Sequence, residues 1–184
     1  MSELATTVTE SRKNENDGGF FKPLEGKNQV RFISEIESFT QYKYGKMKYH
    51  LKESIGNVDP KDIKVSTSYA VWVIDRADGL VKFFTFGPMI FKQIFAISTD
   101  PETAFNELPS YDFKITMTKS GDKTEYMVGY SKEKELTGEE VAMSLNCKPV
   151  MEVVEAMRNK EQKRLSVATP DAALAALGIA KINS

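Results

Sequence analysis

The sequence contains few of the residues that redox and metal chemistry require. Its 184 residues include one cysteine, Cys147, and one histidine, His50. A lone cysteine cannot form an internal disulfide, and a lone histidine without a Cys-x-x-Cys pair gives no zinc-ligand spacing. We therefore expect no disulfide, no metal site and no cofactor.

Long apolar runs and an excess of one charge are missing as well. No stretch approaches the roughly 20 apolar residues that span a bilayer, and the N-terminus does not have the layout of a signal peptide. We expect neither a membrane location nor secretion. The 25 Lys and Arg are balanced by 26 Asp and Glu, for a net charge of −1, so any attraction to phosphate must come from local clusters of charge.

Enzyme motifs are also absent. The sequence has no phosphate-binding glycine-rich loop and no serine nucleophile elbow. Asp75 and Asp78 are the closest acidic pair near a possible groove, and a hairpin turn explains them better than the metal site of a nuclease. We expect a protein that is not an enzyme.

The remaining composition is typical of one folded domain with tails, because 41% of the residues are hydrophobic and 28% are charged. Residues 1–19 are polar and without periodicity, which predicts a flexible arm. The next segment, residues 20–134, is rich in strand patterns. Residues 135–184 are rich in helical patterns, so we expect a C-terminal helical segment and tail.

Alternating apolar residues predict five strands. The first covers residues 28–40, the second and third form a hairpin over residues 68–86 around Asp78-Gly79, and the last two form a hairpin over residues 111–131. A helix is expected to start at Pro88, between the third and fourth strands. Two more helices are expected, one capped at Thr137 and one opened by Pro149, and the Ala/Leu-rich residues 171–180 suggest a short amphipathic helix.

This order of elements is that of an OB-fold, a five-stranded Greek-key barrel with a helix between strands three and four. We therefore predict a mainly β protein, α+β by content, with C-terminal helices added to the barrel. An open α+β sheet with helices packed on one face has the same order of elements and stays an alternative.

Residues 70–130 resemble phage-encoded single-stranded DNA-binding proteins of the OB-fold, which are related in role to the helix-destabilising protein of T4-type phages. The resemblance is carried by the hairpin VWVIDRADGLVKFFTFG, the helix PMIFKQI, and the strands YDFKITMTKSG and TEYMVGY. It implies a sequence-independent DNA-binding protein of phage replication, recombination or repair, located in the cytoplasm of the infected bacterium. The polar residues 54–68, with Gly56-Asn57 and Asp59-Pro60, predict a long loop. The chain departs from this group in two ways, because this loop contains no zinc-binding cysteines and the C-terminus is not acidic.

Single-strand binding requires cations along the phosphate path and flat rings on which bases stack. The segment Gln41 to Lys52 interleaves both, and the second hairpin supplies more lysines and tyrosines near the loop that would form the other wall. The predicted DNA-binding residues are Tyr42, Lys43, Tyr44, Lys46, Lys48, Tyr49, Trp72, Arg76, Lys82, Phe84, Lys114 and Tyr126.

Each choice has a structural alternative. The lysines of residues 41–52 would also protect an exposed edge strand, Trp72 would also fit the core, and lysines in the second hairpin would also be simply solvated. Strict alternation directs Phe84 and Phe86 away from Phe83, so at least one of these rings is expected outside the inner layer.

The sequence also predicts partners. The main one is single-stranded DNA. The apolar residues Leu174, Leu177 and Ile179 suggest that the C-terminal segment contacts a second copy of the chain or a replication protein, with packing on the barrel as the alternative. A protein-interaction or assembly module without nucleic-acid binding is the alternative function, because OB-folds serve many roles.

Overall fold

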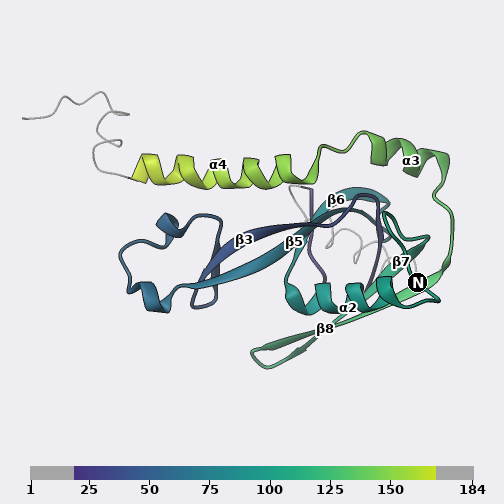
Figure 1. Ribbon diagram of the computed structural model, residues 1–184, viewed down its shortest axis with the longest axis horizontal. Helices are drawn as coiled ribbons and strands as arrows, with labels where there is room; N and C mark the ends of the chain where they lie inside the picture. Colours follow the sequence, from purple (N-terminus) through teal and green to yellow (C-terminus); the bar gives the residue numbers. More distant parts are fainter. Residues whose placement is uncertain (1–18, 169–184) are drawn as a thin grey trace, which may run out of the picture. The chain divides into compact units, whose positions relative to one another are not determined.

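The computed structural model describes residues 19–168, which fold into a mixed α and β structure (Figure 1). In this range eight strands form one sheet, with three α-helices. The described chain divides into two compact units. We call residues 19–38 with 68–150 the sheet unit, and residues 39–67 with 151–168 the hairpin unit. The expected N-terminal arm, except Gly19, and the expected helix over residues 171–180 lie outside the described residues.

The principal strands follow a continuous path with the order β1-β6-β5-β2-β7-β8. Their bounds are β1 Phe20–Phe21, β2 Gly26–Phe32, β5 Lys64–Asp75, β6 Leu80–Phe86, β7 Tyr111–Ser120 and β8 Lys123–Glu133. All neighbours are antiparallel except β1 and β6, which are parallel. The two ends of the path do not pair within residues 19–168, so the sheet is open. This differs from the predicted closed barrel and agrees with the open sheet of the alternative.

Both predicted hairpins are confirmed. Gly79 in the turn between β5 and β6 has a φ of 71°, and Gly121 between β7 and β8 has a φ of 58°. Both values lie in the region that favours glycine. The predicted first strand, in contrast, is interrupted after Phe32. Here the Ser34 hydroxyl accepts a hydrogen bond of 2.9 Å from the backbone amide of Trp72, and the chain bends before the next strand.

The core of the sheet unit lies between one face of the sheet and helix α2, Pro88–Thr99. Ile90 and Ile94 of α2 pack against a cluster that includes Phe32, Phe84 and Phe113. Burying one such side chain stabilises the fold by about 1.5–3 kcal/mol. Gln93 also fixes α2 to β8, because its amide group donates to the carbonyl of Tyr126 and accepts from the amide of Val128.

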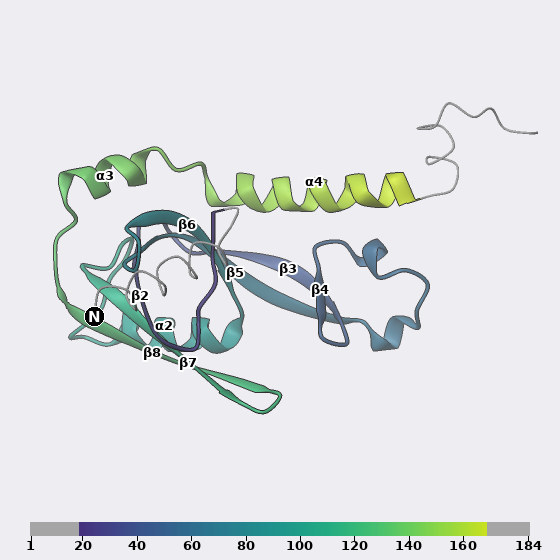
Figure 2. The ribbon, with the colours of Figure 1, turned by 180° about the vertical axis from the view of Figure 1, so that it is seen from behind.

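The hairpin unit contains a hairpin that the sequence did not predict, although the predicted first strand, residues 28–40, includes the first residues of β3, Glu37–Tyr44. β3 and β4 Met47–Tyr49 form this hairpin, seen from behind in Figure 2, and β3 also pairs with β5. A two-residue turn at Gly45 and Lys46 joins the two strands. Only the first turn residue has a positive φ, 59° at Gly45, as in a type II′ turn. The expected loop after this segment contains two short 3-10 helices, η1 Lys52–Ile55 and η2 Pro60–Asp62.

The two later helices were predicted. α3 Gly138–Leu145 begins with a capping box, in which Thr137 and Glu140 each accept a hydrogen bond from the other's backbone amide. α4 Val150–Ala168 begins directly after Pro149. Among residues 19–168, no helix is both long enough and apolar enough to cross a membrane.

Candidate nucleic-acid interface

The charges of the chain are divided unequally between the two units. The hairpin unit contains ten Lys and Arg and six Asp and Glu, a net charge of +4. The sheet unit contains twelve basic and fifteen acidic residues, a net charge of −3. The near-neutral total therefore hides a basic unit, and this unit contains half of the residues that the sequence predicts as DNA-binding.

The β3–β4 hairpin places its lysines and tyrosines on opposite faces. Tyr42 pairs with Tyr49, Lys43 with Lys48, and Tyr44 with Met47. Because neighbouring residues of a strand point to opposite faces, Lys43 and Lys48 share one face and the tyrosines share the other. The sixth predicted residue of this segment, Lys46, lies exposed in the turn. The interleaving seen in the sequence thus becomes a basic face and an aromatic face.

Lys43 and Lys48 lie directly opposite each other with no acidic partner. Neither forms an ion pair within the described part of the chain. Partial desolvation of its ammonium group, together with the neighbouring charge of Lys43, lowers the pKa of Lys48 below its usual value of 10.5, although the residue is exposed at the surface. Like charges that face each other across a strand pair cost about 0.2–1 kcal/mol. A bound anion would remove this repulsion.

A groove of about 770 Å³ lies beside the basic face and within the hairpin unit. It is lined by Lys43, Tyr44, Gly45, Lys61, Asp62 and Lys64. Three of these six residues are lysines and one is acidic. Lys61 and Lys64 were missed by the sequence analysis, which interpreted residues 54–68 as a loop. Their proximity to Lys43 depends on the pairing of β3 with β5, for which no local sequence signal exists.

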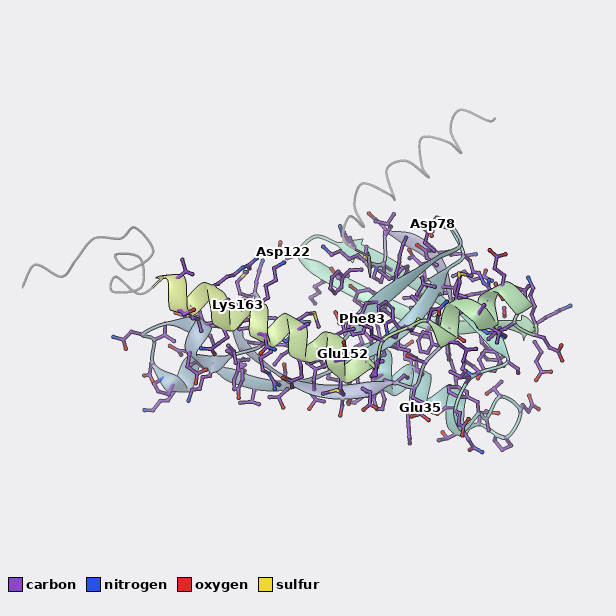
Figure 3. The ribbon with its side chains drawn as sticks, turned by 90° about the horizontal axis from the view of Figure 1, so that it is seen from above. Glu35, Asp78, Phe83, Asp122, Glu152 and Lys163 are labelled. Carbon is purple, nitrogen blue, oxygen red and sulfur yellow. The ribbon has the colours of Figure 1, made fainter. Side chains whose placement is uncertain are left out.

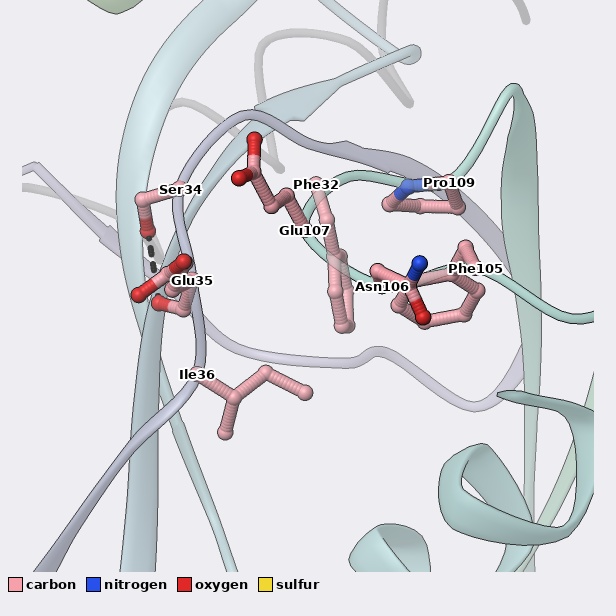
Figure 4. A pocket seen from close by; sticks show the side chains of 8 residues that line it. All are labelled: Phe32, Ser34, Glu35, Ile36, Phe105, Asn106, Glu107 and Pro109. Atoms are coloured by element: carbon pink, nitrogen blue, oxygen red, sulfur yellow. Dashed lines mark hydrogen bonds between the residues drawn. The ribbon is translucent and has the colours of Figure 1, made fainter. Parts of the chain in front are cut away.

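A second hollow, of about 330 Å³, belongs to the sheet unit (Figure 4). Phe32, Ile36 and Phe105 give it an apolar lining, and Glu35 and Glu107 give it two carboxylates. Its lining contains no lysine or arginine. An acidic hollow repels phosphate, so among these two hollows only the groove of the hairpin unit suits a polyanion.

Arg76 is held in a network of ion pairs in the sheet unit. Its guanidinium group forms two hydrogen bonds of 3.0 Å with the carboxylate of Asp112 and a further ion pair with Glu140. Asp112 also accepts hydrogen bonds from Arg31 and Gln29. This arrangement uses the donors of Arg76 within the fold and leaves its side chain only 20% exposed. The structure therefore gives a structural role to a residue that the sequence predicts as DNA-binding.

Lys82 is also paired inside the sheet unit. Its ammonium group lies 2.9 Å from a carboxylate oxygen of Asp75 and 2.5 Å from one of Asp78, the residue labelled in the β5–β6 turn of Figure 3. Lys82 is 3% exposed. A phosphate can reach this ammonium group only if the turn opens, so the predicted contact with DNA does not fit the described conformation.

The aromatic residues of the β5–β6 hairpin are largely buried. Phe84 and Phe86 belong to the core cluster, whereas Phe83 lies outside it, as strict alternation predicts. All three rings are nevertheless buried, so none of them is open for stacking in the described conformation. Phe83 is covered on the second face of the sheet by Phe20 and by the edge of Trp72. Trp72 is partly buried, and its indole N–H donates a hydrogen bond of 2.7 Å to the carbonyl of Lys148. Stacking of a base on Phe84 would require the core to open.

The last two predicted residues lie on the β7–β8 hairpin. Lys114 is exposed on β7, whereas Tyr126 is partly buried against the core. The acidic residues Asp122 and Glu125 lie on the same hairpin. The structure thus collects Tyr42, Lys43, Tyr44, Lys46, Lys48 and Tyr49 in the hairpin unit, and it leaves the other six predicted residues in the sheet unit.

Neither a search for metal-binding residues nor comparison with known proteins gives a further indication of function. Within residues 19–168, no group of three or more His, Cys, Asp or Glu residues could hold a metal ion. Comparison of this chain with protein family models, with curated proteins and with solved structures finds no match.

Proposed function

We propose that this chain binds single-stranded DNA without reading its sequence, through the hairpin unit. The observation that carries the proposal is the Lys43–Lys48 pair. These two lysines face each other without an acidic partner among residues 19–168, beside a groove that also contains Lys61 and Lys64. Lysines spaced along a groove contact phosphates, which every sequence presents alike. The proposal is a binding function and involves no catalytic step.

The tyrosine face of the β3–β4 hairpin is proposed to hold the bases. Tyr44 is 39% exposed and lies at the groove, one residue from Lys43. Every base has a flat face, so stacking on tyrosine tolerates any sequence. A strand that passes the tip of the hairpin at Gly45 and Lys46 can meet lysines on one side and tyrosines on the other.

The order of strands supports a relationship to the OB-fold. β7, β2, β5 and β6 are neighbours in that order, so the fourth of these strands along the chain returns beside the first, as in a Greek key. α2 connects the third and fourth of these strands. In OB-folds, the loop between the first two strands borders the ligand. Here that connection contains β3 and β4, and we propose that it serves phage DNA replication, recombination or repair.

Salt dependence tests the proposed function most directly. We expect a fluorescent oligothymidylate to bind the full-length chain more tightly than a duplex of the same length, because a duplex hides the faces of its bases. The logarithm of affinity should fall linearly with the logarithm of salt concentration, by about 0.7 for each phosphate contact. No binding at low salt would reject the proposal in favour of a protein-interaction module. Equal affinity for the duplex would reject the stacking on tyrosine.

Tyr44→Ala should weaken single-strand binding without a loss of stability. Loss of one stacking contact costs about 1–3 kcal/mol, which corresponds to a loss of affinity of roughly 5- to 150-fold. Tyr130→Ala is the matched control, because Tyr130 is 47% exposed but lies on β8 in the acidic sheet unit. Oligonucleotide titrations and melting temperatures of both variants check this prediction. An equal effect of the two substitutions on affinity would contradict it.

A further inference from the structure

A glutamate of α4 is bound by three hydrogen-bond donors at the end of β4. The backbone amides of His50 and Leu51 donate to the two carboxylate oxygens of Glu161, each over 2.9 Å. The hydroxyl of Ser54 donates to the same oxygen as Leu51. All four residues belong to the hairpin unit. We call the amides of His50 and Leu51 and the Ser54 hydroxyl the oxyanion cradle.

The oxyanion cradle has the chemistry of a phosphate site. Adjacent backbone amides and a hydroxyl are donors that proteins commonly use for phosphate oxygens, and a carboxylate presents similar acceptor oxygens. The cradle directly follows the basic face, because Lys48 lies two residues before His50, and Lys52 follows Leu51. Lys48 and Lys52 are both exposed.

Glu161 occupies this cradle from a helix that is only lightly packed. In the part of α4 that belongs to the hairpin unit, Val154 is the only fully buried residue among those described. Met157, Glu161 and Leu165 continue the same stripe and are half-buried, and Lys163 in the last turns is exposed (Figure 3). Glu161 thus occupies a position of the stripe where an apolar residue would pack. Its three hydrogen bonds with His50, Leu51 and Ser54 connect the second half of α4 to the end of β4.

The cradle keeps the glutamate ionised. Burial alone would raise the pKa of Glu161, but the hydrogen bonds from Ser54, His50 and Leu51, together with the charge of His50, lower it below its usual value of 4.5. At neutral pH the occupant is therefore an anion, and the oxygens of a phosphate can accept the same three hydrogen bonds in its place.

We propose that the oxyanion cradle is a phosphate-binding site of the DNA interface, which Glu161 occupies in the free protein and leaves when a strand binds. The inference rests on the proposed function and adds a regulatory element to it. The strand and the second half of α4 compete for the same donors, so binding of DNA releases this half of α4, and a partner that holds α4 in place weakens binding of DNA.

The test compares two variants of the full-length chain. Glu161→Gln removes the competing anion, and Glu155→Gln makes the same change of charge at an exposed residue of α4 whose recorded partner is Arg158. Glu161→Gln should bind an oligothymidylate about tenfold more tightly at low salt, with a salt slope steeper by about 0.7, because one phosphate contact is gained. Glu155→Gln should change affinity less than about twofold. Equal effects of the two substitutions would overturn the inference.

Amide chemical shifts separate this inference from the proposed function. Inorganic phosphate should shift the His50 and Leu51 amides in Glu161→Gln and leave them in place in the wild type. If these shifts occur but no variant binds DNA, the anion site stands and the proposed function fails. If DNA binds but phosphate moves neither amide, Glu161 is only a structural clamp and the inference fails.

The wild-type chain provides a measurement that does not depend on folding of the variant. Addition of an oligothymidylate should shift the His50 and Leu51 amides and accelerate hydrogen exchange in residues 155–168 of α4. Binding that leaves both observables unchanged would overturn the inference.

Discussion

Replacement of Lys43, Lys46 and Lys48 together by alanine is expected to weaken oligonucleotide binding by about a hundredfold or more at roughly 50 mM salt, because about three phosphate contacts are lost. The slope of affinity against salt should become less steep by about two, at 0.7 for each contact. Titration of the triple variant over a range of salt concentrations measures both effects.

Stability should change in the opposite direction to affinity. In the described part of the chain, Lys43 and Lys48 face each other without an acidic partner, so their removal relieves a repulsion. The free energy of unfolding should therefore stay the same or rise slightly. A loss of affinity that accompanies a lower melting temperature would indicate damage to the β3–β4 hairpin rather than loss of phosphate contacts.

The β7–β8 hairpin supplies the matched control. Lys114, Lys119 and Lys123 are exposed, so their replacement by alanine makes the same change of charge in the sheet unit. We expect only a small loss of affinity, because the acidic Asp122 and Glu125 lie among these lysines. If this control lost as much affinity as the first variant, the binding site would have to be moved to the second hairpin.

The sequence predicted the fold best where local chemistry determines it. Asp78-Gly79 gave the β5–β6 turn, Pro88 the start of α2, and Thr137 with Glu140 the capping box of α3. These signals act over a few residues. Closure of the sheet has no such local signal, because it depends on pairing between the two end strands, which lie far apart in the chain. The described strands form an open sheet.

The sequence placed six of the candidate residues in one segment, which the structure folds into the β3–β4 hairpin, but it could not show which charges are buried in ion pairs. A lysine or arginine on a strand looks accessible in the sequence, but Arg76 is paired with Asp112, 36 residues away. The groove lysine Lys61 and the oxyanion cradle depend on similarly distant contacts, and Glu161 lies 107 residues from Ser54. Periodicity placed Phe83 on the face opposite to Phe84 and Phe86, but it could not show that Phe20 and Trp72 cover this second face.

Asp112→Ala is expected to cause the largest loss of stability in the chain. Asp112 lies between Arg31, whose side chain is 2% exposed, and Arg76, and it accepts hydrogen bonds from both. Removal of one member of a buried ion pair costs about 3–5 kcal/mol, because the remaining charge is left buried. For a chain of this size, that loss lowers the melting temperature by about 10 °C. Asp122→Ala, in the exposed turn of the same hairpin, is the control and should change little.

The same network makes the stability depend on pH in a defined direction. Burial alone would raise the pKa of Asp112, but hydrogen bonds from Arg76 and Gln29 and the charges of Arg76 and Arg31 outweigh it and lower the pKa below 3.8. The folded state therefore has the lower pKa, so the stabilisation is complete above about pH 4 and is lost as the pH falls through the pKa of the folded state. In Asp112→Ala this acid-dependent part of the unfolding free energy should be missing.

Arg76→Ala separates the structural role of Arg76 from its predicted role as a DNA contact. The substitution should lower the melting temperature, because it removes the partner of Asp112, while the folded protein should keep its affinity for DNA. A tenfold loss of affinity with an unchanged melting temperature would instead make Arg76 a phosphate contact and extend the interface to the sheet unit.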